Sequence, residues 1–274
     1  MPSCDTYVSS LSGKHGLEIG GPSEMFDDSG PLPVYSSLGM LDNCLYSDRT
    51  LWTGDVKVGR TFEFHPQKQK GTQFICEASD LGIIKDSSYE CVLASHCLEH
   101  VANPLRALEE WKRVMKGDGL LLLVLPHKDA TFDWRRPITT LSHIIEDHDQ
   151  GIGENDLTHV PEILALHDLE KDKPAGSPDE FRRRCLDNIS NRAIHHHVFD
   201  TLSALRMVDY AAYQVLRVDP IEPFNIIILA AACKGLPNNE SFLGTDASYR
   251  DSSPFASDRL SEVPSGDRVK EKAT

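Results

Sequence analysis

Residues 87–127 decide the fold, and their sequence is SSYECVLASHCLEHVANPLRALEEWKRVMKGDGLLLLVLPH. Two apolar runs of strand length, residues 89–95 and 120–125, enclose a segment whose apolar side chains recur at the spacing of one helix face. These side chains are Leu105, Leu108, Trp111, Val114 and Met115. Asn103 fits the N-cap of this helix and Pro104 its first position. The stretch therefore predicts a strand–helix–strand unit with parallel strands.

The same alternation continues on both sides of this unit. Short apolar runs predict three earlier strands, at residues 16–19, 33–41 and 72–76. Later, a helix at residues 201–212 leads to strands at 214–218 and 225–231, whose short connection predicts an antiparallel hairpin at one edge. We predict an α/β fold with a doubly wound, mostly parallel, seven-stranded Rossmann-like sheet.

Residues 128–199 interrupt this rhythm after the fifth strand. Positions 138–190 contain twelve acidic and five basic residues and few apolar runs. We interpret 128–199 as a partly helical insertion within one domain of residues 1–235, rather than as a second domain. Residues 236–274 are rich in Ser, Asp, Pro and charge, a composition that predicts disorder.

The composition excludes several functional classes. Of the 274 residues 40% are hydrophobic and 26% charged, which is typical of a globular protein. The net charge of −14 disfavours binding to nucleic acid, because an acidic surface repels phosphates. No apolar run approaches the roughly 20 residues of a membrane span, and the polar N-terminus lacks the order of a signal peptide. Seven scattered cysteines without a C-x-x-C motif indicate reduced thiols, so we expect a soluble, cytoplasmic protein.

A glycine bend follows the first predicted strand, in the sequence Leu17-Glu18-Ile19-Gly20-Gly21. Glycines at the carboxyl end of a parallel strand let a ligand approach the backbone at the edge where such folds bind ligands. The alternative is a tight strand-to-helix turn with no ligand. Two acids at the ends of the neighbouring strands favour the ligand.

Asp42 follows the second predicted strand, close to the offset of about 20 residues from the glycines at which an acid meets ribose hydroxyls. Asp80 follows the third strand, where its carboxylate could accept from an adenine amino group while the Leu81 backbone N–H donates to the ring. Each acid has a simpler interpretation, since Asp42-Asn43 favours a turn and Asp80 fits a helix N-cap or a loop.

Taken together, Glu18-Ile19-Gly20-Gly21, Asp42, Ser79-Asp80-Leu81 and residues 87–127 resemble the class I S-adenosylmethionine-dependent methyltransferases. The resemblance covers residues 12–234 and is closest to the small-molecule branch of ubiquinone- and menaquinone-type enzymes. It implies S-adenosylmethionine as cofactor and a small-molecule acceptor. The family pattern acid-x-Gly-x-Gly-x-Gly has Pro22 and Glu24 at its later positions here, and Pro22 has no N–H to donate.

The resemblance also implies a role for each matching residue. Glu18, Gly20 and Gly21 would line the methionine end of the cofactor, and Asp42 would bind the ribose. Asp80 and Leu81 would hold the adenine. Ser95 and His96 would close over the sulfonium.

Three further residues are candidates for catalysis. His127 directly follows the fifth strand and could act as a general base, with Asp129 as its orienting partner; the alternative is a hydrogen bond from His127 to the insertion. Arg135, together with the adjacent Arg136, could clamp a substrate carboxylate, or pair with the acids of the insertion. The histidines of the insertion lack a recognised metal-ligand spacing, so we predict structural or solvated histidines and no metal site.

Three functional hypotheses remain at this stage. The first is methyl transfer to a small molecule by in-line displacement, with residues 128–199 as a lid over the acceptor. The second is the same cofactor-bound fold catalysing a cyclase, lyase or metal-assisted reaction. The third is a non-catalytic binding protein built on a methyltransferase fold, which the altered glycine loop suggests.

Overall fold

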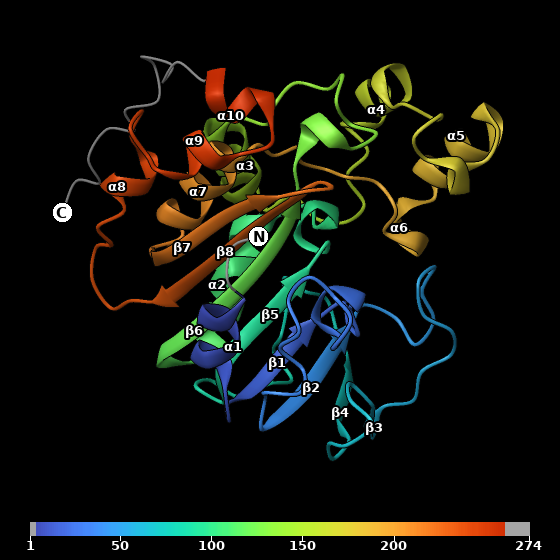
Figure 1. Cartoon of the computed structure of the whole chain (residues 1–274). Coiled ribbons are helices and arrows are strands. Elements are labelled where there is room, and N and C mark those ends of the chain that lie inside the picture. The colour runs from blue at the N-terminus through green and yellow to red at the C-terminus, as the bar shows by residue number, and fades with distance from the viewer. Residues whose placement is uncertain (1–3, 261–274) are drawn as a thin grey trace.

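The computed structural model describes residues 4–260 and is organised around one eight-stranded sheet (Figure 1). The strand order is β3-β4-β2-β1-β5-β6-β8-β7. The strands are β1 (His15–Ile19), β2 (Met40–Leu45), β3 (Gly59–Phe62), β4 (Gly71–Ile75), β5 (Tyr89–Ser95), β6 (Met115–Pro126), β7 (Tyr213–Ile221) and β8 (Asn225–Ala232). The central pairs are parallel, and β3, β7 and β8 are antiparallel to their neighbours. The predicted Rossmann-like sheet with an antiparallel edge hairpin is confirmed, with one additional edge strand.

The strand–helix–strand unit at residues 87–127 forms as predicted. Helix α2 (Pro104–Val114) connects β5 to β6, and the Asn103 side chain caps it by accepting from the Arg106 backbone N–H. The apolar stripe of α2 is buried against the sheet. Strand β6 begins at Met115, directly after the helix.

The second strand was predicted wrongly. It spans Met40–Leu45 rather than residues 33–41, so Asp42 lies inside the strand and not after it. Residues 33–38 form an irregular segment whose apolar side chains, among them Val34, Tyr35 and Leu38, are buried. Burial of these side chains explains the apolar pattern that resembled a strand.

Two layers cover the sheet. Alternation along β5 directs Val92 and Ala94 into one apolar cluster with α2 and α7 (Thr201–Tyr210), while Cys91 and Leu93 face the other. The second cluster is closed by α1 (Asp5–Leu11), the short 3-10 helix η1 (Glu24–Phe26) and residues 32–38. Helices therefore dominate one face, and irregular chain much of the other.

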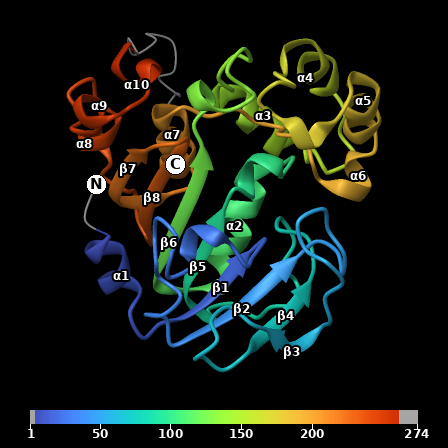
Figure 2. The same cartoon turned by 45° about the vertical axis from the view of Figure 1, so that its right-hand side comes forward.

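The insertion lies beyond the end of the sheet toward which β6 runs (Figure 2). It contains α3, α4, α5 and α6 and the short 3-10 helices η3 and η4. Their bounds are η3 (Lys128–Ala130), α3 (Leu141–Gln150), α4 (Val160–Leu166), η4 (Lys173–Ala175), α5 (Pro178–Leu186) and α6 (Asn188–Asn191). A small apolar cluster that includes Val160, Ile163 and Phe181 holds its outer part together. The insertion therefore covers the carboxyl ends of the central strands, where ligands bind in folds of this class.

Residues 236–260 are ordered, contrary to the prediction of disorder. They form the short helices α8 (Glu240–Leu243), α9 (Tyr249–Ser252) and α10 (Ala256–Leu260) beside β7 and α7. Residues 261–274, the rest of the predicted tail, lie outside the described residues. Within residues 4–260, no helix combines the length and the apolarity needed to span a bilayer.

Candidate functional site

The glycine bend after β1 is required by the close approach of neighbouring atoms. Gly20 has a φ of +85°, and a Cβ there would lie 3.2 Å from the Cys97 Sγ atom. A Cβ on Gly21 would lie 2.2 Å from the Glu18 carboxylate. Both glycines are therefore needed for the chain to turn at the edge between β1 and β5, as the sequence predicts.

The Glu18 side chain is fully buried beneath this bend. Its Oε1 atom accepts from the Ser23 backbone N–H at 3.2 Å, and the Tyr35 hydroxyl lies 2.8 Å from both carboxyl oxygens. Burial raises the pKa of Glu18 to about 8, and the hydrogen bonds from Tyr35 and Ser23 offset only part of this effect. At neutral pH Glu18 is therefore mostly a protonated acid that shapes the bend from inside.

Asp42 lies toward the amino ends of the strands, away from the glycine bend. Its carboxylate accepts from the Thr72 backbone N–H at 2.6 Å and from the Tyr89 hydroxyl at 2.9 Å, and lies 3.2 Å from the His15 Nε2 atom. Burial opposes ionisation of Asp42, but these hydrogen bonds prevail and lower its pKa. The structure therefore does not bring Asp42 together with Glu18 and Gly20, because β2 continues for three residues beyond it.

Asp80 and Leu81 follow β4, at the expected edge. Asp80 is exposed, and its Oδ1 atom accepts from the Gly82 backbone N–H at 3.2 Å. The Leu81 backbone N–H donates to the Glu110 Oε2 atom at 2.8 Å, so a protein carboxylate already occupies the donor that the sequence assigned to adenine. Of the pair, only the Asp80 side chain is open to a ligand.

Three polar side chains gather where β5 ends. The Ser95 hydroxyl and both Glu99 carboxyl oxygens are buried without a hydrogen-bond partner. His96 has a φ of +49°, and its Nε2 atom lies 2.9 Å from the Asn225 Oδ1 atom. The His96 Nδ1 atom lies 3.7 Å from Glu99, whose pKa is raised by burial. Unpartnered buried groups in a native protein call for an explanation, and a polar ligand bound beside them supplies one.

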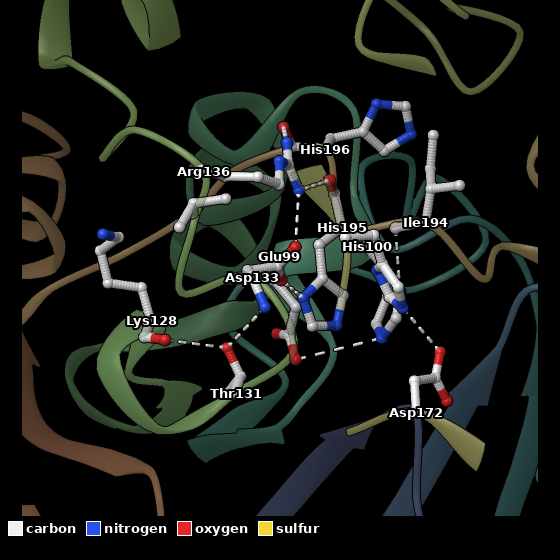
Figure 3. A network of polar contacts seen from close by, with 12 residues as sticks. Glu99, His100, Lys128, Thr131, Asp133, Arg136, Asp172, Ile194, His195 and His196 are labelled. Atoms are coloured by element: carbon white, nitrogen blue, oxygen red, sulfur yellow. Dashed lines mark hydrogen bonds and ion pairs between the residues drawn. The ribbon is translucent and has the colours of Figure 1, made fainter. Parts of the chain in front are cut away.

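The insertion contributes a network of buried charges to the same edge (Figure 3). The Asp133 carboxylate lies 2.5 Å from the His195 Nδ1 atom and 3.1 Å from the Arg136 guanidinium. Burial opposes ionisation of Asp133, but His195 and Arg136 outweigh it and lower its pKa to about 2. Burial also opposes protonation of His195, yet Asp133 raises the pKa of that ring. Arg136 further donates to the backbone carbonyls of His195 and His196.

This network adjoins the end of β5. The His196 backbone N–H donates to the Glu99 carbonyl at 2.8 Å, and the His100 Nδ1 atom lies 3.0 Å from the Ile194 carbonyl oxygen. Burial and the neighbouring His195 hold the pKa of His100 well below its usual range. The insertion is therefore joined to β5 by backbone and side-chain contacts around Glu99.

A second contact joins the insertion to the ends of β2 and β4. The Tyr46 hydroxyl, directly after β2, donates to the Asn191 carbonyl at 3.1 Å, and the Arg192 guanidinium lies 5.1 Å above the Tyr46 ring. Arg192 also pairs with Glu77 after β4 at 2.5 Å. The strand ends β2, β4 and β5 are thus all in contact with residues 188–196.

His127 is inaccessible in this structure. Its side chain is fully buried, its ring stacks on Phe255 at 4.0 Å, and its Nε2 atom lies 3.2 Å from Asp258. The other ring nitrogen accepts from the Asp129 backbone N–H. Both nitrogens therefore have protein partners, one in the insertion as the structural alternative expected, and the other, Asp258, in residues 253–260.

Asp129 and Arg135 also have partners in the protein. The Asp129 carboxylate accepts from the Ser257 backbone N–H at 2.8 Å and borders a groove of about 580 Å³ with Trp134, Glu222 and Phe255. Arg135 is 3.3 Å from Asp168 and lies over the Trp134 ring. Arg135 follows the second of its two alternatives, pairing with an acid of the insertion.

Sequence reasoning missed Glu99 and did not bring it together with the other most buried members of the site. Glu99, Asp133 and Arg136 come together only through tertiary contacts between the end of β5 and the insertion. The one signal that could have found them is the presence of acids and an arginine beside histidines in LEH (98–100), DWRR (133–136) and HHH (195–197).

Comparison with known proteins supports a methyltransferase. Residues 56–123, from the approach to β3 to the middle of β6, match the family model of a methyltransferase domain. No curated protein matches the sequence. The family match confirms the prediction of a methyltransferase, and with it that of S-adenosylmethionine as cofactor.

Solved structures with a similar arrangement include several S-adenosylmethionine-dependent methyltransferases of low sequence identity. One from Methanosarcina mazei is 16% identical with a TM-score of 0.47, and covers 83% of this chain and 97% of its own. One from Aquifex aeolicus is 12% identical with a TM-score of 0.41, covering 84% and 89%. A putative methyltransferase from Bacillus halodurans is 12% identical with a TM-score of 0.46, covering 84% and 97%.

Proposed function

We propose that this methyltransferase transfers the methyl group of S-adenosylmethionine to a small-molecule acceptor at the carboxyl ends of β1 and β5. The observation that carries the proposal is the glycine bend at Gly20 and Gly21 beside the unpartnered buried groups of Ser95 and Glu99. A bend that admits no side chain allows a ligand to approach the backbone, and the unpartnered groups provide it with polar contacts.

The residues at this edge fit the chemistry of the cofactor. Gly20 would line its methionine end, Ser95 would contact it there, and His96 would lie beside the sulfonium on the acceptor side, with Glu18 supporting the bend from below. Asp80, exposed after β4, would accept from the adenine amino group. We leave Asp42 and the Leu81 N–H out of this set because protein groups already bind them. When bound, S-adenosylmethionine supplies a methyl group already activated on a sulfonium, so the protein need only align the acceptor, exclude water and remove a proton.

His96 is better placed than His127 to move that proton. Its side chain is 30% exposed, and when Nε2–H donates to Asn225, the Nδ1 atom is left with a free lone pair. A base at this position would accelerate transfer to a hydroxyl or protonated amine by roughly 100- to 10,000-fold. His127, by contrast, is sealed beneath residues 253–260.

We infer a small acceptor of the class handled by the ubiquinone- and menaquinone-type branch that residues 87–127 resemble. The net charge of −14 supports a small molecule over a nucleic acid. Residues 128–199 would form the acceptor side of the site, since they contact the ends of β2, β4 and β5.

The test is calorimetry with S-adenosylhomocysteine, followed by turnover of S-adenosylmethionine with candidate acceptors. We expect His96→Gln to bind S-adenosylhomocysteine within a few-fold of the wild type and to lose at least about 100-fold in kcat. His148→Gln is the matched control, because His148 lies on α3 beside Glu109 of α2 and not at this edge, and it should change neither quantity. Absence of S-adenosylhomocysteine binding to the wild type would overturn the proposal, and adenosine-type products without a methylated acceptor would favour the cyclase or lyase alternative.

A further inference from the structure

Four side chains from three separate segments converge on one point of the insertion. His143 and Asp147 lie on α3, His159 is the N-cap residue of α4, and His197 precedes α7. One ligand atom from each of these residues lies within 4.8 Å of the others. Sequence analysis predicted no metal site, because 54 positions separate the first of these residues from the last.

We propose that His143, Asp147, His159 and His197 bind one divalent transition-metal ion of the zinc class. Three imidazoles and one carboxylate form a donor set that suits zinc, and four protein ligands correspond to a closed, structural site. The proposal concerns a second site, and it holds whether or not the proposed methyl transfer is correct.

The distances between the four ligand atoms support this assignment. The Nε2 atoms of His143 and His159 lie 3.3 Å apart, and the Asp147 Oδ2 atom lies 3.4 Å from His143 Nε2 and 3.0 Å from His197 Nε2. Ligand atoms at about 2.0–2.2 Å from a tetrahedral ion are separated by roughly 3.3–3.6 Å. Two of the three separations fall in this range, and the third requires a small outward movement.

Local structure fixes two of the ligands before any ion binds. His143 and Asp147 are four residues apart on α3, so both project from one face of the helix. The Thr140 side chain caps the start of α3, and Gly151 ends it with a φ of +63°. The helix therefore holds an imidazole and a carboxylate at a fixed separation, and His159 and His197 complete the set from other segments.

Burial of the four side chains is graded across the cluster. The His197 side chain is 0% exposed and that of Asp147 is 11% exposed, whereas that of His143 is 39% exposed. An ion can therefore reach the cluster from the His143 side. The buried His197 Nδ1 atom has no hydrogen-bond partner, so this ring is held through its Nε2 atom, the one that faces the cluster.

A second group of possible ligands is less suited to an ion. It consists of Glu99, His100 and His195. The Glu99 Oε1 atom and the His100 Nε2 atom are 4.0 Å apart, wider than a tetrahedral ion allows. His195 is also paired with Asp133, and that pairing favours its charged form, which leaves no lone pair for a metal. The third group, Asp156, His159 and His196, shares His159 with the proposed site.

An ion at this site would fasten the insertion to the end of β5. The Asp147 carbonyl accepts from the Asn103 side chain at the start of α2, and Ile144 of α3 is buried in the main core. His197 lies next to His196, whose backbone N–H donates to the Glu99 carbonyl. The ion would therefore hold α3, the start of α4 and residues 195–197 together above the strand ends.

The experiment uses the full-length chain, stripped with a chelator and dialysed. Cobalt(II) serves as the spectroscopic probe and zinc(II) as the competitor, with bound metal counted by mass spectrometry. We expect one equivalent of cobalt with the visible absorption of a tetrahedral site, its displacement by zinc, and a rise in Tm on binding. His143→Ala should lower the affinity at least about 100-fold, as expected when one of four ligands is lost, and should abolish the Tm shift.

His148→Ala is the matched control, because His148 lies on the same helix with a half-buried side chain and outside the cluster. It should bind cobalt as the wild type does. His159→Ala provides a second ligand variant on a different segment, and circular dichroism verifies that each variant is folded. Absence of saturable cobalt binding to the wild type, or equal affinities in His143→Ala, His159→Ala and His148→Ala, would overturn the proposal. The cobalt titration contains neither S-adenosylmethionine nor a methyl acceptor, so a negative result in it is distinct from failure of the methyl-transfer proposal.

Discussion

The substitution Glu18→Gln tests whether the buried acid beneath the glycine bend is protonated. The ordinary pKa of Glu18 is 4.5, and burial raises it to about 8 in the folded protein. Between these two values the unfolded chain has lost the proton that the folded protein keeps. Ionisation therefore stabilises the unfolded state. As pH rises through this window, the free energy of unfolding decreases because of Glu18.

The size of this effect follows from the two pKa values. A difference between 4.5 and about 8 corresponds to about 5 kcal/mol of stability that is present below pH 4.5 and lost by pH 8. Glutamine cannot ionise, so Glu18→Gln should abolish this loss. Its amide can also reproduce the hydrogen bonds of the protonated acid. The amide oxygen can accept from the Ser23 N–H, and the amide oxygen and nitrogen can both contact the Tyr35 hydroxyl.

Urea unfolding followed by tryptophan fluorescence, at several values from pH 5 to pH 8.5, measures the difference. We expect Glu18→Gln and wild type to have similar stability near pH 5 and the variant to become more stable by several kcal/mol near pH 8. Glu24→Gln, at an exposed position of η1, is the control and should follow the wild type. Parallel curves for Glu18→Gln and wild type would refute a protonated, buried Glu18.

Four further substitutions test the positions of other residues. Asp42→Asn should lower the free energy of unfolding by about 1–3 kcal/mol and leave S-adenosylhomocysteine affinity unchanged; weaker affinity at full stability would restore its ribose role. Arg136→Met should lower that free energy by about 3–5 kcal/mol, because it removes one of the two charged partners of buried Asp133 and the donor to the His195 and His196 carbonyls, whereas Arg135→Met should change it by less than about 1 kcal/mol, both by urea unfolding. Asp258→Ala should lower Tm by several degrees, yet calorimetry should show unchanged S-adenosylhomocysteine binding. Loss of that binding would contradict the position of His127 and Asp258 outside the cofactor site.

The sequence predicts those parts of the fold whose apolar pattern is local. Residues 87–127 carry the strand, the cap, the helix and the next strand in one continuous pattern, and all of these form. Strand β2 was missed because its centre is polar. Asn43 is fully buried there, and its side chain bonds both to the Gly21 backbone and to Gln73. A polar residue satisfied by distant partners interrupts the apolar pattern on which strand prediction depends.

The same limit applies to the C-terminal segment and to the site. Residues 236–260 have the composition of a disordered tail, but Asp258 is fully buried, accepts from the Thr201 hydroxyl and lies 3.2 Å from the His127 Nε2 atom. Such bonds link positions far apart in the chain and leave no local pattern. For the site, the glycine bend and the end of β5 were predicted, while the position of Asp42 depended on where β2 ends.

The contacts between residues 128–199 and the strand ends determine how these residues can move. Opening them as a lid would break the hydrogen bonds from the His196 N–H to the Glu99 carbonyl and from the Tyr46 hydroxyl to the Asn191 carbonyl, and would separate Arg192 from Glu77. Each such contact contributes about 0.5–1.5 kcal/mol, so together they would keep the open state at about one per cent or less. We therefore expect residues 128–199 to be a fixed wall of the acceptor site, with exchange of ligands through movement of smaller segments. If Arg136→Met leaves turnover unchanged while lowering stability, the wall is structural; a raised KM for the acceptor at unchanged donor affinity would show that it shapes the acceptor site.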